Sequence, residues 1–124
     1  MTQKTTKIIG WILTAIVALI FIASAFMKLT GGEELSKSAE SMGLSLTTIK
    51  LLGVLELFCL FLFIFPRTGI LGTLLLAAYM GGVIATHLEH AQPILVPVII
   101  ECIIWITAVI RFPELLRRIT GKDL

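Results

Sequence analysis

The sequence has few charged residues, too few to cover the surface of a soluble protein of this length. Asp, Glu, Lys and Arg make up 15% of its 124 residues and apolar residues 57%, whereas about 25% of the residues in an average soluble domain are charged. A formal net charge of +2 is too small to indicate nucleic-acid binding. With a mean hydropathy of +1.03, the composition predicts a membrane protein, and the length predicts a single domain.

Reactive motifs are also scarce. Cys59 and Cys102 are the only cysteines. They do not form a Cys-x-x-Cys pair, which argues against a membrane thiol-redox enzyme. We expect both to be buried free thiols that pack as small apolar residues. The loop residues His87, Glu89 and His90 are weak evidence for a metal site, so no metal is predicted. No phosphate loop or nucleophile–base pair is present, and we therefore expect no enzyme activity from this chain on its own.

Long apolar runs, by contrast, are abundant. A spanning helix needs about 20 apolar residues, and four runs predict such helices at about residues 8–28, 47–65, 69–87 and 94–111. A short polar helix is expected at about 33–42, closed by Gly43. A short interfacial helix is expected at about 113–120, because Pro113 can start it. The predicted fold is an all-α integral membrane four-helix bundle, one membrane domain over residues 1–124.

The basic residues predict how this bundle is oriented. If both termini are cytoplasmic, seven of the ten Lys and Arg residues lie inside and three outside, in agreement with the positive-inside rule. The inside set is Lys4, Lys7, Arg67, Arg111, Arg117, Arg118 and Lys122, and the outside set is Lys28, Lys37 and Lys50. The N-terminus also resembles a signal peptide, because Lys4 and Lys7 precede an apolar run and Ala23-Ser24-Ala25 resembles a cleavage site. Because cleavage would remove one of four helices, we expect this helix to be retained.

Two glutamates lie inside the apolar runs, where a carboxylate is costly unless it is protonated, paired or facing water. At about 1.5 Å per residue from the outer ends of their helices, Glu56 is roughly 13 Å deep and Glu101 roughly 11 Å deep. On the same side, Lys28 ends the first helix and His87 ends the third. The candidates for ligand or proton binding are therefore Lys28, Glu56, His87 and Glu101, with Gly53, Tyr79 and Trp105 as candidate pocket-lining residues. The alternative is that the glutamates hydrogen-bond to neighbouring helices and hold them together.

The third predicted helix carries small residues at every fourth position. These are Gly69, Thr73, Ala77, Gly81 and Ala85. In a membrane such a stripe lets another helix approach closely. We expect it to pack inside the bundle, and a seam between two copies of the chain is the alternative.

Three short segments carry a resemblance to a known family. Ala25-Phe26-Met27-Lys28-Leu29 closes the first helix, Gly53-Val54-Leu55-Glu56-Leu57 lies in the second, and Pro66-Arg67-Thr68-Gly69 turns into a Gly/Ala-rich helix that ends at His87. Together they resemble the DoxX-like family of small bacterial membrane proteins, over about residues 8–110. The resemblance implies a four-helix bundle in the bacterial inner (plasma) membrane, with both termini on one side. The family name comes from subunits associated with quinone-linked sulfur oxidation, but most members have no assigned activity, so no chemistry is carried over.

Three functions are compatible with these features. The leading hypothesis is an accessory bundle whose polar intramembrane pocket binds a lipid-like or quinone-like molecule, in the service of a membrane oxidoreductase. The second is a small proton-coupled transporter, because buried carboxyls are common proton relays; flux into liposomes that depends on Glu56 would favour it. The third is a structural or assembly factor that needs the glutamates for folding. The expected partners are membrane lipids, an oxidoreductase subunit or a second copy of the chain, and no cofactor is required by the sequence, although a quinone would fit.

Overall fold

The computed structural model of the chain describes residues 2–121 and contains six helices and no strand within that range. The helices are α1 (Gln3–Thr30), α2 (Glu33–Ser41), α3 (Leu46–Ile64), α4 (Gly69–Glu89), α5 (Leu95–Arg111) and α6 (Pro113–Thr120). The all-α fold class is thus confirmed. α1 begins at Gln3 rather than at residue 8, because Thr2 caps it by accepting a hydrogen bond from the backbone N–H of Thr5.

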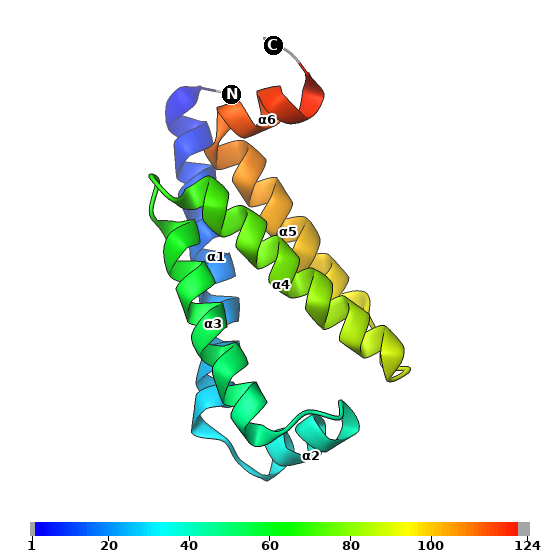
Figure 1. Ribbon diagram of the computed structural model, residues 1–124. Coiled ribbons are helices and arrows are strands. Elements are labelled where there is room, and N and C mark those ends of the chain that lie inside the picture. The colour runs from blue at the N-terminus through cyan, green and yellow to red at the C-terminus, as the bar shows by residue number, and fades with distance from the viewer. Residues whose placement is uncertain (1, 122–124) are drawn as a thin grey trace.

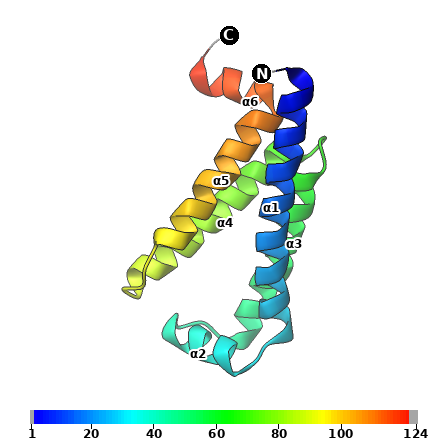
Figure 2. The same cartoon turned by 180° about the vertical axis from the view of Figure 1, so that it is seen from behind.

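The four longer helices contact one another in a ring. α1 packs against α3, α3 against α4, α4 against α5, and α5 against α1. Seen from both sides, the α1–α3 pair and the α4–α5 pair converge at the end that carries α6 and the start of α1, and they diverge toward the other end (Figures 1 and 2). The short helix α2 lies at the wide end, where Gln92 Nε2 donates to Ser41 Oγ at 3.1 Å. The polar connections therefore meet at the wide end of the molecule.

Three of these helices, α1, α3 and α4, are long and apolar enough to cross a membrane. α5 has 17 residues and counts as a fourth crossing only when it is taken together with α6, from which it is bent by 106°. Large apolar side chains such as Leu19, Phe26 and Leu95 are about two thirds exposed, as lipid-facing residues are. The structure thus has three or four candidate spans, and the four-span bundle stays a prediction.

A compact core fills the centre of the ring. Phe21 of α1, Phe63 of α3, Leu76 of α4 and Ile104 of α5 are nearly or fully buried and belong to one hydrophobic cluster. Buried threonines such as Thr73 donate their hydroxyl to the carbonyl four residues earlier in the same helix, which satisfies a polar group without a partner helix. The core therefore holds the ring together mainly by apolar packing.

The small-residue stripe of α4 has two different halves. Gly69 lies against the tip of the Phe112 ring, at its Cζ atom, and Thr73 is fully buried. Ala77 is half-buried, whereas Ala85 is exposed and an added Cβ at Gly81 would meet no atom within 4 Å. The first half of the stripe packs inside the protein and the second half faces outward.

A close approach of α4 to α3 involves a glycine outside this stripe. An added Cβ at Gly72 would overlap the backbone of Phe63 in α3. The tight turn between the two helices brings them this close, and Thr68 Oγ1 stabilises that turn by donating to the Leu62 carbonyl. Gly72 is thus the position where α3 and α4 need a residue without a side chain.

The two cysteines are free, and their surroundings differ. Cys59 is 1% exposed and belongs to the core cluster, as expected. Cys102 is exposed on the outer surface of α5, so the expectation that it is buried was wrong. Its position on an otherwise apolar helix gave no indication of which way it faces.

Candidate functional site

An ion pair joins α1 to α3 inside the protein. Lys28 Nζ lies 2.8 Å from Glu56 Oε2 and also donates to Ser24 Oγ at 2.7 Å. The Glu56 side chain is 1% exposed, and that of Lys28 is 20% exposed. Because Lys28 lies in the last turn of α1, the negative end of the helix dipole also favours its positive charge. Glu56 is therefore a buried carboxylate with a charged partner on the neighbouring helix.

Gly53 makes this pairing sterically feasible. It lies one turn before Glu56 on the buried face of α3, where an added Cβ would sit 3.1 Å from Lys28 Cβ and 3.3 Å from Leu29 Cγ. Such distances are tighter than ordinary van der Waals contact, so a side chain at position 53 would require the Lys28 and Leu29 side chains to shift by a few tenths of an ångström. Gly53 was predicted to line a pocket, and the structure places it under the first carbon of the Lys28 side chain.

Tyr79 brings a third helix to the pair. Its hydroxyl, on α4, donates to Glu56 Oε2 at 3.3 Å, and its ring centroid is 5.7 Å from Lys28 Nζ. Phe21 of α1 packs edge-on against the same ring, with centroids 6.4 Å apart. Both hydrogen bonds to the carboxylate thus end on one oxygen, and helices α1, α3 and α4 meet at a small polar centre beside the ring of Phe21.

Glu101 and His87 are not part of this centre. Glu101 accepts a hydrogen bond from Trp105 Nε1 at 3.1 Å, one turn along its own helix, and the two side chains are half-buried. The Nδ1 atom of His87 lies 2.7 Å from the Val83 carbonyl, again within one helix. In the part of the chain that the structure describes, no hydrogen bond or ion pair joins either residue to Lys28 or Glu56. The structure brings together two of the four candidate binding residues, Lys28 and Glu56, with Tyr79 beside them.

Sequence reasoning missed Ser24 and Arg111. Ser24 lies four residues before Lys28 on α1, so helical spacing alone could have placed it on the same face. Arg111 was counted only as a basic residue for topology. In the structure its guanidinium donates to the carbonyls of Phe63 and Ile64 at 2.7 and 2.9 Å. It therefore satisfies the last turn of α3 at the narrow end of the bundle, a long-range contact that no local pattern encodes.

The hydrogen bonds of Lys28 leave part of its ammonium group unused, and the described residues show no metal-binding arrangement. A lysine ammonium has three N–H donors, and two of those on Lys28 are directed to Ser24 and Glu56. The third has no hydrogen-bond acceptor among residues 2–121. Among residues 2–121, no group of three or more His, Cys, Asp or Glu side chains is arranged to hold a metal ion.

The chain matches one protein family. A family model described as the DoxX-like family matches residues 12–110, about four fifths of the chain. No curated protein and no solved structure matches the chain. The family match and the long apolar helices indicate a multi-pass membrane protein. The matched range includes Lys28, Glu56 and Tyr79.

Proposed function

The chain belongs to the DoxX-like family, and we propose that it is an accessory membrane bundle that binds the polar head of a quinone-like or lipid-like molecule at Lys28, Glu56 and Tyr79. The observation that carries this proposal is the uneven burial of the ion pair. Glu56 is 1% exposed, whereas Lys28 is 20% exposed and has one N–H left for an acceptor. A quinone carbonyl or a lipid ester carbonyl offers such an acceptor.

The orientation and the setting belong to the same proposal. Both termini are placed in the cytoplasm of a bacterium, with four spans in its inner membrane, because seven of ten basic residues then lie inside. Arg111 and the α6 residues supply part of this excess. The sequence has no complete catalytic constellation, which favours an accessory role beside a membrane oxidoreductase over catalysis by this chain alone.

A photoreactive quinone analogue tests the binding site. The purified protein in detergent is irradiated with the probe, and the labelled peptides are located by mass spectrometry. We expect labelling near Lys28 on α1 that unmodified quinone suppresses and that falls several-fold in Glu56→Gln. Glu101→Gln is the matched control, because it makes the same chemical change on a helix outside the polar centre. Equal labelling of the parent and Glu56→Gln would contradict the proposal.

A structural role for the ion pair is the second candidate, and the contacts of Glu56 favour it. Lys28 and Tyr79 connect the carboxylate to two neighbouring helices. This candidate predicts that Glu56→Gln melts at a lower temperature and that no quinone labelling reaches the pair in any variant. Tyr79→Phe separates the two ideas further, because it keeps the ion pair and removes only a hydroxyl. Reduced labelling at an unchanged melting temperature in this variant would support ligand binding.

A further inference from the structure

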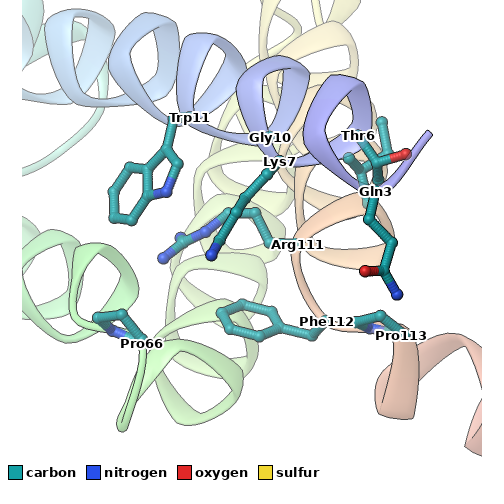
Figure 3. A pocket seen from close by; sticks show the side chains of 10 residues that line it. Gln3, Thr6, Lys7, Gly10, Trp11, Pro66, Arg111, Phe112 and Pro113 are labelled. Carbon is teal, nitrogen blue, oxygen red and sulfur yellow. The ribbon is translucent and has the colours of Figure 1, made fainter. Parts of the chain in front are cut away.

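A second polar region lies at the opposite, narrow end of the bundle, away from the ion pair. A cavity of about 420 Å³ opens there between the first turns of α1, the α3–α4 turn and the α5–α6 junction. Figure 3 shows the side chains of Lys7 and Arg111 in the middle of the residues that line this cavity, with Trp11 above them and Phe112 below in this view. The site shares no residue with the proposed quinone site.

The cavity is positively charged and has no acidic residue among the described residues that line it. Lys7 is exposed and has no salt-bridge partner within residues 2–121. Arg111 directs two N–H groups to the carbonyls of Phe63 and Ile64, and a guanidinium has five such donors. The ammonium of Lys7 and the Arg111 donors that these two carbonyls do not use are the groups that an anion in the cavity would contact, and a phosphate group is the kind of anion that they fit.

The Arg111 guanidinium is held in a defined position. Its central carbon lies 4.9 Å from the ring centroid of Trp11, 4.8 Å from that of Phe112 and 5.2 Å from that of Phe63. Gly10 leaves room for its side chain, because an added Cβ would sit 3.0 Å from Arg111 Cγ. A cation held in this way loses little further freedom when it binds an anion, which favours binding.

An apolar groove continues from the cavity along the outer face of α1. It shares Lys7 and Trp11 with the cavity and extends along α1 from Lys4 past Ile8 and Ile12 to Ala15. Ile8 and Ile12 are about half exposed, on a helix long and apolar enough to cross a membrane. A ligand that fills both spaces has an anionic head and an apolar tail.

The position of the cavity agrees with such a ligand. It lies where the apolar run of α1 begins, and it ends at Pro113, the first residue of α6. α6 turns away from α5 by 106° and carries Leu116 and Ile119 exposed beside the basic residues of its last turn. An amphipathic helix of this kind lies along a membrane surface, which places the cavity at the depth of lipid headgroups.

We propose that this cavity binds the phosphate of an anionic phospholipid, with one acyl chain of that lipid in the groove along α1. Free phosphate would engage the same cations but would leave the apolar groove empty. The lipid is therefore the ligand that uses both features.

Native mass spectrometry of the full chain in detergent tests this proposal. The protein is titrated with phosphatidylglycerol, with phosphatidylcholine carrying the same acyl chains, and with glycerol phosphate as a head-only competitor. We expect one phosphatidylglycerol to be retained in preference to phosphatidylcholine, and glycerol phosphate to displace it poorly. Lys7→Gln is expected to weaken retention about fivefold, since one basic residue at an anionic surface contributes ~1 kcal/mol.

Arg118→Gln is the matched control, because Arg118 is an exposed α6 residue at the same end and lines neither space. It removes the same charge and should retain the lipid nearly as well as the parent. If Lys7→Gln and Arg118→Gln weaken the retention of phosphatidylglycerol equally, general surface charge explains the binding and the proposal is overturned. Equal retention of the two lipids would also overturn it, and full displacement by glycerol phosphate would assign the cavity to a soluble anion instead. Because Lys7 is outside the quinone site, this test can fail while the quinone proposal stands.

Discussion

Lys28 and Glu56 form an ion pair whose two members are buried to different degrees. The carboxylate of Glu56 is 1% exposed, whereas the ammonium side chain of Lys28 is 20% exposed at the end of its helix. Long basic side chains near a helix end can reach the membrane surface when a partner is lost. The shorter carboxylate side chain of Glu56, which is buried between the helices, cannot reach the membrane surface in this way. The two halves of the pair should therefore respond differently to substitution.

We predict that Lys28→Met destabilises the protein more than Glu56→Gln does. Lys28→Met leaves a buried carboxylate without its countercharge, at a cost of about 3–5 kcal/mol in the free energy of unfolding. Glu56→Gln keeps a hydrogen-bonding side chain and should cost about 1–2 kcal/mol. Unfolding in detergent with increasing SDS, followed by circular dichroism, measures both values.

The double variant Lys28→Met/Glu56→Gln separates lost charge pairing from lost packing. Because it contains no unpaired buried charge, it should be more stable than Lys28→Met alone. Glu101→Gln, whose side chain is bonded within its own helix, should stay close to the parent. If the double variant is as unstable as Lys28→Met, packing of the lysine stem rather than the unpaired carboxylate explains the loss.

Two glycines of α4, Gly72 and Gly81, should differ in how much stability is lost when each is replaced by alanine. Gly72→Ala would drive a methyl group into the backbone of Phe63, and since backbone cannot rotate away, the cost should reach about 3 kcal/mol. Gly81→Ala meets no atom within 4 Å and should be neutral or stabilising by up to ~1 kcal/mol, because alanine favours helix. Melting temperatures of the two variants in one detergent measure the difference. A loss of stability in Gly81→Ala would instead indicate that this exposed half of the stripe packs against another copy of the chain.

The cysteines predict a difference in reactivity. Cys102 is exposed and Cys59 is 1% exposed, so a membrane-permeant maleimide should add once to the folded protein in detergent and twice after denaturation in SDS. Intact mass counts the adducts, and digestion locates them. Cys102→Ser serves as the control and should show no adduct before denaturation. Two adducts on the folded parent would contradict the burial of Cys59.

Several properties follow from the order of residues along the chain. The length and spacing of the apolar runs predicted helices near the observed positions of α1, α3, α4 and α5, because helix length and burial in lipid both depend on consecutive apolar residues. The position of Glu56 inside such a run predicted a polar group in need of a partner, and Lys28, at the end of the first helix on the same side, was among the candidates. The family, too, was evident from short local segments and is confirmed over residues 12–110.

The tertiary structure alone decided which of the polar residues meet. Sequence position gives the depth of a residue along a helix, but the direction of its side chain depends on rotation about the helix axis. After its polar first turn α3 carries apolar residues on every side of Glu56, so no periodic pattern indicated that Glu56 faces Lys28 and Tyr79. For the same reason Glu101 looked equivalent to Glu56, although it bonds to Trp105 on its own helix. Packing around the glycines of α3 and α4 sets the rotation of each helix about its axis, because small residues allow two helix backbones to approach closely.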